Sequence, residues 1–119
     1  MRLAETQFGK FYYFENDCLG RSIVSGPFYD EHLRPFFDAL HEGDVLVDVG
    51  ANIGFFTVYA AVHRRASVVA FEASTVLFSV LEKNIAINGV RDRVLAYPIM
   101  CRCGIVRRSS EFAQDGMTM

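Results

Sequence analysis

Apolar residues follow two different periods along the middle of the chain. Two short runs, 45–49 and 67–71, are almost wholly apolar and rich in β-branched residues, which is typical of central strands in a parallel sheet. Apolar residues recur at helical spacing over 55–62 and 76–85, directly after each run. A third strand is expected over 93–99. This β-α-β-α-β order predicts a parallel sheet with right-handed crossovers and helices on both faces.

The N-terminal part has a mixed pattern. Aromatic residues dominate 8–14, a polar turn follows at 15–17, and 22–24 is short and apolar. We interpret these as a hairpin of two strands. After Gly26-Pro27, apolar residues lie on one helical face over 33–40 and predict a helix before the first central strand.

These patterns divide the chain into three segments. Residues 1–42 hold the N-terminal hairpin and helix, and 43–104 form the parallel α/β unit. Residues 105–119 carry no periodicity, so we expect a frayed or truncated C-terminal segment.

Composition and charge narrow the function classes. The chain has 119 residues, of which 51% are hydrophobic and 22% charged, as expected for one small globular domain. The formal net charge is -2. Since this charge provides no attraction for polyanions, we expect neither a nucleic acid nor an anionic membrane surface as partner.

The expected compartment is the cytoplasm. We find no signal peptide, and three cysteines are an odd number, so reduced thiols are expected. Cys101 and Cys103 lack a second pair at zinc-site spacing, and no metal is expected. The long apolar stretch 45–62 contains Asp48 and two glycines, which a membrane span disfavours, so we expect no membrane segment.

The main candidate for chemistry is Asp48-x-Gly50-x-Asn52-x-Gly54, which follows a strand and opens a helix. Gly50 permits a tight turn and close approach of a ligand to the backbone. Asn52 tolerates the left-handed conformation, and Gly54 permits close packing of helix on strand. The N–H groups at the helix N-terminus favour an anionic ligand group.

A second candidate is Glu72, which ends the second strand 22 positions after Gly50. Rossmann-type folds place an acid about there to bind ribose hydroxyls. Either feature alone has an ordinary explanation, because glycine turns join many strands to helices and an acid at a strand end is often only solvated. Their order and separation together predict a nucleoside-type ligand, although the loop spacing departs from the dinucleotide fingerprint G-x-G-x-x-G.

The segment 47–57 resembles the first motif of class I S-adenosylmethionine-dependent methyltransferases, and more narrowly of the FkbM family. Residues 69–74 are similar to the second motif of that family, with Ala73 where proline is usual. Residues 81–89 resemble its helix with two spaced asparagines. The resemblance covers about 43–104 and implies a Rossmann-like half-domain that binds S-adenosylmethionine.

By this resemblance, Asp48 and Gly50 border the methionine moiety of the cofactor, and Glu72 holds the ribose hydroxyls. Phe71 and Ala73 flank the adenosine. The implied cofactor-binding residues are Asp48, Gly50, Ala51, Asn52, Ile53, Gly54, Phe71, Glu72 and Ala73. Residues 100–104 lack the short polar pattern that the family places near the adenine.

The resemblance implies O-methylation of a hydroxyl on a sugar or secondary metabolite, with a small-molecule acceptor. The chain has no counterpart of the fourth strand of the class I fold, so no general base can be named. We therefore expect an incomplete fragment or a half that needs a partner chain. Two competing hypotheses are an NAD-binding Rossmann module and a non-catalytic α/β remnant.

Overall fold

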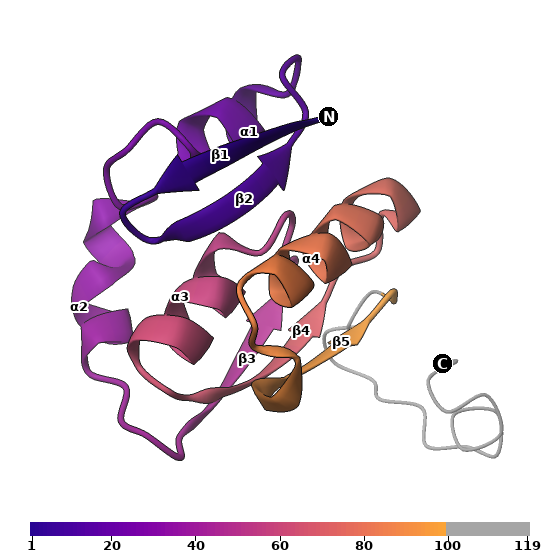
Figure 1. Cartoon of the computed structure of the whole chain (residues 1–119). Helices are drawn as coiled ribbons and strands as arrows, with labels where there is room; N and C mark the ends of the chain where they lie inside the picture. The colour runs from indigo at the N-terminus through magenta and orange to yellow at the C-terminus, as the bar shows by residue number, and fades with distance from the viewer. Residues whose placement is uncertain (100–119) are drawn as a thin grey trace, which may run out of the picture.

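The computed structural model describes residues 1–99, which form a three-stranded parallel sheet and an N-terminal hairpin (Figure 1). The elements in chain order are β1 Arg2–Thr6, β2 Gly9–Tyr13, α1 Cys18–Ile23, η1 Glu31–Leu33, α2 Arg34–Asp38, β3 Val45–Val49, α3 Phe55–His63, β4 Ser67–Phe71, α4 Thr75–Ile87, η2 Arg91–Arg93 and β5 Val94–Tyr97. The β-α-β-α-β order predicted from the sequence is confirmed.

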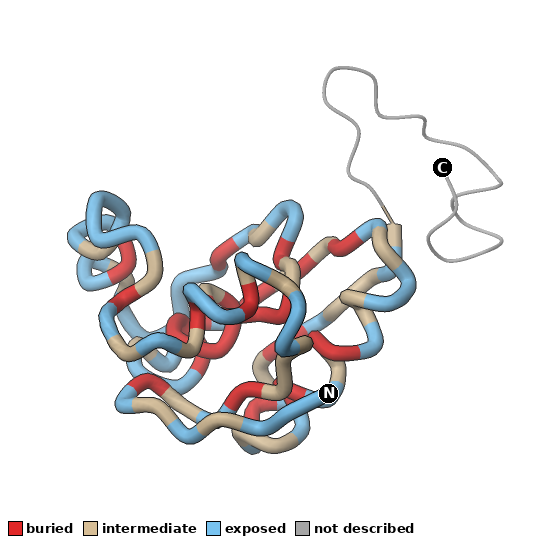
Figure 2. The backbone as a smooth tube through the Cα atoms, turned by 90° about the horizontal axis from the view of Figure 1, so that it is seen from above, coloured by how far each residue is buried: buried red, intermediate tan, exposed pale blue. Residues whose placement is uncertain are grey.

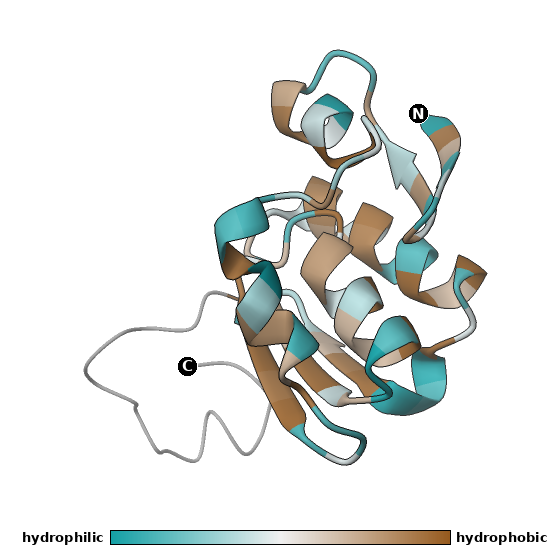
Figure 3. Ribbon diagram, turned by 90° about the vertical axis from the view of Figure 1, so that its left-hand side faces the viewer, coloured by the Kyte–Doolittle hydropathy of each residue, from teal (hydrophilic) through white to brown (hydrophobic). Residues whose placement is uncertain are grey.

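The sheet has the order β3-β4-β5, and all of its strands are parallel. Among residues 1–99, α3 and α4 lie on one face of this sheet (Figure 1), so the expectation of helices on both faces is wrong for this part. The cause is the strand order, because two successive right-handed crossovers in the same direction place both helices on the same side. As a result, exposed side chains on β3 include Val45, Val47 and Val49. In Figure 3 the strands of the parallel sheet are largely brown, the colour of hydrophobic residues.

The predicted N-terminal hairpin exists, but β2 pairs with β1 in antiparallel register and not with 22–24. Residues 18–23 form α1, so the strand predicted over 22–24 is wrong. A cap explains the difference, since the Asp17 side chain accepts a hydrogen bond from the Leu19 backbone N–H and starts a helix there.

The helix predicted over 33–40 is shorter and broken. A 3-10 turn, η1, leads into α2, and Pro35 lies in the first turn of α2. Proline has no backbone N–H and disfavours the helical conformation in the residue before it, so it fits only the start of a helix. Phe37 is buried by α2, whereas Phe36 is exposed.

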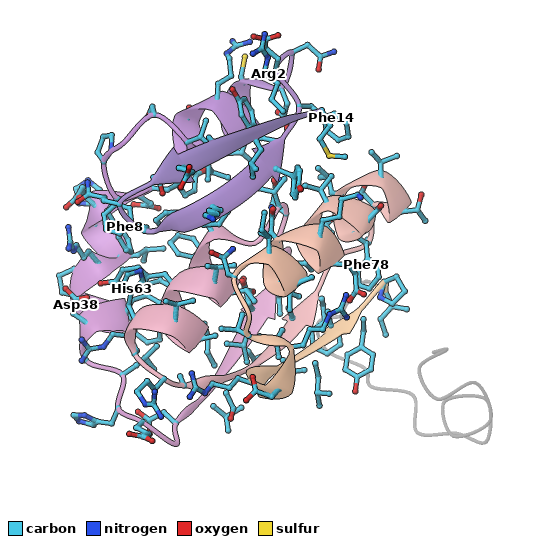
Figure 4. All side chains as sticks on the ribbon, viewed as in Figure 1. Arg2, Phe8, Phe14, Asp38, His63 and Phe78 are labelled. Carbon is cyan, nitrogen blue, oxygen red and sulfur yellow. The ribbon has the colours of Figure 1, made fainter. Side chains whose placement is uncertain are left out.

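The buried residues form one hydrophobic cluster that includes side chains from the hairpin and from the α/β unit (Figure 2). Phenylalanines dominate its N-terminal side, where Phe8, Phe28 and Phe55 meet edge to face. His63 Nε2 lies 3.1 Å from the Phe8 carbonyl oxygen, and Figure 4 shows both residues where the hairpin approaches α3. The N-terminal segment is therefore packed onto the α/β unit. None of the helices within residues 1–99 combines the length and the apolar character needed to cross a membrane.

Candidate functional site

The loop of residues 50–54, called here the glycine loop, joins β3 to α3 through three left-handed residues. Gly50 has φ 74°, Asn52 has φ 57° and Gly54 has φ 101°. The conformation expected for Asn52 is thus confirmed. The backbone N–H groups of Gly50 and Ala51 both donate to the Phe71 carbonyl oxygen, at 2.8 and 2.9 Å, which fixes the start of the loop to β4.

The two glycines of this loop are needed for different reasons. A Cβ placed on Gly54 would lie 2.7 Å from Cδ1 of Leu81, so Gly54 permits the close approach of α4 to the loop. The sequence pattern indicated a different role for this glycine, the packing of the helix on the strand. A Cβ placed on Gly50 would meet nothing within 4 Å. Gly50 therefore faces open space, and its left-handed backbone is the feature that disfavours a side chain there.

Glu72 directly follows β4, and its carboxylate bridges two loops. Its side chain is buried, with the residue 8% exposed. Oε1 accepts the Asn52 backbone N–H at 2.7 Å, and Oε2 accepts the Ser74 backbone N–H at 2.9 Å. The ordinary explanation of a solvated acid at a strand end does not apply here. Since a carboxylate oxygen can accept two hydrogen bonds, each oxygen keeps capacity for a ligand hydroxyl.

Asp48 lies near the end of β3, next to the strand that leads to Glu72. Thr57 on α3 is fully buried, and its hydroxyl donates to Asp48 Oδ2 at 2.7 Å. Burial raises the pKa of Asp48, and the nearby Glu72 carboxylate raises it further, whereas the hydrogen bond from Thr57 lowers it. Two carboxylates therefore lie at the carboxyl ends of neighbouring strands, on either side of the glycine loop.

Two cavities border the glycine loop, and both are lined by Gly50 and Phe56. One has a volume of about 270 Å³ and extends toward α1 and the segment before η1; its other lining residues are Leu19, Ile23, Tyr29, Asp30, Ala51, Asn52 and Phe55. The other, of about 430 Å³, lies between α2 and β3 and includes Asp48 and Phe36.

The N-terminal segment also lines the first cavity, which the sequence patterns did not indicate. Tyr29 and Asp30 lie there, and Asp30 has a left-handed backbone with φ 60°. In the sequence, the aspartate at position 30 is a residue type common in turns, and this fits an ordinary loop as well as a cavity lining.

The residues expected near the adenosine lie at the end of β4 and just after it. Phe71 is half-buried and stacks on Tyr97 of β5, with ring centroids 5.7 Å apart, and Ala73 is exposed. Tyr97 was not singled out from the sequence. Residues 100–104, where adenine contacts were in question, lie outside the described residues, as do Cys101 and Cys103.

A protein-family model matches most of the chain. The family model described as "TRM5/TYW2 methyltransferase domain" matches residues 28–114 of the chain, which is more than half of its length. The match includes the glycine loop and Glu72. It favours a methyltransferase over the NAD-binding hypothesis.

Two curated relatives are methyltransferases. The chain is 39% identical over 97 residues to the 31-O-demethyl-FK506 methyltransferase FkbM of Streptomyces tacrolimicus, a match that covers 78% of this chain and 35% of the relative. It is 38% identical over 61 residues to methyltransferase sdnD of Sordaria araneosa, covering 50% of this chain and 22% of the relative. The chain thus spans about a third or less of the length of these relatives.

Solved structures give the same fold. TYW2 of P. horikoshii in complex with MeSAdo is similar with a TM-score of 0.53 and 32% identity, over 56% of this chain and 25% of that one. The complex of aTrm5 with tRNALeu has a TM-score of 0.57 at 16% identity, over 78% of this chain and 26% of that one.

These comparisons correct two expectations. A class I methyltransferase fold is confirmed, but the matching family model is TRM5/TYW2, so the narrower assignment to the FkbM family is not supported. The exclusion of nucleic acid as a partner is wrong, because the TRM5/TYW2 model matches and aTrm5 is solved with tRNALeu. The error lay in the charge argument, since the net charge of a chain covering about a quarter of such proteins does not describe their binding surface.

Proposed function

Because the chain belongs to the TRM5/TYW2 methyltransferase domain family, we propose that its residues 43–104 hold S-adenosylmethionine, the cofactor of that family, at the glycine loop. One observation carries the proposal. Asp48 and Glu72 lie at the carboxyl ends of neighbouring parallel strands, on either side of a left-handed glycine whose outer side is open. Ligands of open α/β sheets bind at this end of the strands.

The donor and acceptor groups of the site fit the parts of this cofactor. Glu72 is held rigidly by two backbone N–H groups, so its remaining lone pairs are preorganised for the ribose hydroxyls. Asp48, held by Thr57, would accept a hydrogen bond from the α-ammonium group of the methionine moiety. The proposed cofactor-binding residues are those named from the sequence: Asp48, Gly50, Ala51, Asn52, Ile53, Gly54, Phe71, Glu72 and Ala73.

When bound, the cofactor supplies an electrophilic methyl group on a sulfonium, which an acceptor attacks in line. The task of the protein residues is to hold the cofactor rigid and to orient its methyl group, since positioning supplies much of the rate enhancement in such a displacement. The glycine loop suits this task because its backbone N–H groups are fixed to Phe71, Glu72 and Ala51.

For the acceptor, we propose a tRNA nucleotide. The family match and the aTrm5–tRNALeu complex support this class. A second candidate is a hydroxyl group that undergoes O-methylation, and the 39% identity to FkbM over 97 residues favours it. Incubation of the chain with methyl-labelled cofactor and either total tRNA or a polyhydroxylated macrolide separates the two, because label in the tRNA fraction supports the first and label in the macrolide the second.

The cofactor proposal is tested by isothermal titration of the folded 119-residue chain with S-adenosylhomocysteine and, separately, with NADH. Glu72→Gln is the test variant and Glu82→Gln on α4 is the matched control, since both replace a carboxylate by an amide of the same shape. We expect binding of S-adenosylhomocysteine that weakens about tenfold in Glu72→Gln, the effect of losing one charged hydrogen bond, and is unchanged in Glu82→Gln. Binding of NADH alone would contradict the proposal.

A further inference from the structure

Two asparagines, Asn84 on α4 and Asn88 at the C-cap of that helix, hydrogen-bond to the backbone of β2. Asn84 Oδ1 accepts the Tyr12 backbone N–H at 2.6 Å, and Asn84 Nδ2 donates to the Tyr12 carbonyl oxygen at 3.1 Å. One turn later, Asn88 makes the same pair of bonds to Lys10, at 3.0 and 2.8 Å. The two side-chain amides thus take the place of a neighbouring strand along β2 and attach the hairpin to the helix.

Asn84 differs from Asn88 in one further contact. Its Nδ2 also donates to the Ile53 carbonyl oxygen at 2.7 Å, in the fully buried interior. The other end of the same peptide unit is the Gly54 N–H, which donates to the Ala51 carbonyl oxygen at 2.9 Å. Asn84 therefore completes the fixation of the peptide between Ile53 and Gly54, at the end of the glycine loop that leads into α3.

The remaining hydrogen bonds of Asn88 do not reach this loop. Its Nδ2 donates to the Lys10 carbonyl oxygen and to the Asn84 carbonyl oxygen, at 2.8 and 2.7 Å. Asn88 is also half-buried, whereas Asn84 is 0% exposed. The chain thus offers a matched pair of residues on one helix face, of which one contacts both the hairpin and the loop and the other contacts the hairpin.

We infer that Asn84 is a positioning residue for cofactor binding: it ties β2 to the glycine loop and holds the Ile53–Gly54 peptide in the orientation that the cofactor requires. This inference rests on the proposed function for its effect on the cofactor. Without the Asn84 amide, the buried Ile53 carbonyl has no donor, and a peptide next to a left-handed glycine can rotate at small steric cost. Rotation would turn the Gly54 N–H away from the Ala51 carbonyl oxygen and so release the bond that closes the loop back onto Ala51.

The test compares Asn84→Ala with Asn88→Ala in the full 119-residue chain, by isothermal titration with S-adenosylhomocysteine and by urea unfolding. We expect both variants to lose stability, because both lose bonds to β2. Affinity for S-adenosylhomocysteine falls about tenfold or more in Asn84→Ala and stays within about twofold in Asn88→Ala. The reason is that Asn84→Ala leaves the Ile53 carbonyl of the loop unpaired, whereas Asn88→Ala leaves the loop unchanged. Equal affinity losses in the two variants, or none in Asn84→Ala, overturn the inference.

A second measurement needs no ligand and no variant. Native-state hydrogen exchange of the wild-type chain follows the amides of Tyr12 and Gly54, which our inference places in one cooperative unit. We expect their opening free energies to respond together to low urea concentrations. If the two amides open separately, with Gly54 exchanging about a hundredfold faster than Tyr12, the inference is contradicted. If the wild-type chain does not bind S-adenosylhomocysteine, the proposed function fails, while hydrogen exchange still decides whether Asn84 couples the loop to the hairpin.

Discussion

The Glu72 carboxylate accepts the Asn52 backbone N–H at 2.7 Å, so the acid that ends β4 also holds the loop that follows β3. Its second oxygen accepts the Ser74 N–H, at the residue that caps α4. One side chain therefore fixes two loops at the edge where parallel strands of this fold present their ligand sites. A residue in this arrangement serves the stability of the site as well as the binding of a ligand.

This double role predicts a difference between two substitutions of Glu72. Glu72→Ala leaves two partly buried N–H groups without their acceptor, and we expect it to lower the free energy of unfolding by about 2 kcal/mol. Glu72→Gln keeps one acceptor oxygen and should lose about half as much. Urea unfolding followed by far-UV circular dichroism measures both. Equal stability of Glu72→Ala and the wild type would show that the two N–H bonds do not hold the loops.

The glycine loop predicts a contrast between its two glycines. Gly54→Ala combines a left-handed backbone with a Cβ only 2.7 Å from Leu81 Cδ1, so we expect a loss of about 2–4 kcal/mol in stability. Gly50→Ala has the backbone strain alone and should lose about 1–2 kcal/mol. Relative to its loss of stability, Gly50→Ala should lower the affinity for S-adenosylhomocysteine more than Gly54→Ala does. The reason is that the new methyl group at Gly50 enters the open side of the loop. Thermal unfolding and titration with S-adenosylhomocysteine, carried out on both variants, test this contrast.

The sequence predicted the α/β unit well because each of its elements carries a local signal. The runs at 45–49 and 67–71 are strands with those bounds, and the helical pattern over 76–85 lies within α4. A short parallel strand is indicated largely by its own run of apolar, β-branched residues.

The N-terminal segment was harder because its structure depends on distant contacts. The strand β2 is held by Asn84 and Asn88, more than seventy positions away, with sequence separations of 72 and 78. The bridging role of Glu72 was equally invisible, since a sequence shows that an acid follows a strand and not which N–H groups it accepts. The cofactor-binding residues named from the sequence stay a prediction until ligand binding is measured.

Asp48 predicts a pH dependence of stability. Its pKa is raised above the ordinary value of 3.8, chiefly by burial, so the folded state binds this proton more tightly than the unfolded state. The stabilisation from protonated Asp48 is present below about pH 3.8 and is lost as pH rises through the folded-state pKa. Asp48→Asn has no such loss, because its amide oxygen accepts from Thr57 at every pH. We therefore expect the variant to gain stability relative to the wild type as pH rises.

Urea unfolding at a series of pH values from 3.5 upward would measure this difference. Asp92→Asn, which changes an exposed aspartate on η2, is the control and should follow the wild type. A constant difference between Asp48→Asn and the wild type across the series would mean that Asp48 titrates alike in both states.

Within residues 1–99, the face of the sheet opposite α3 and α4 is exposed at β3, and this predicts self-association of the 119-residue chain. Val45, Val47 and Val49 are 61%, 57% and 57% exposed on one strand, and contiguous apolar surface of this kind promotes association in water. Val47→Lys places a charge at the centre of this row and should shift sedimentation toward the monomer at a given concentration, with little loss of stability because the side chain has few contacts to lose. Val76→Lys on α4 is the matched control, since Val76 is 58% exposed but lies on a helix away from the row. Association that falls equally in both variants would show that added charge alone is responsible, whereas a reduction confined to Val47→Lys assigns it to the open face of β3.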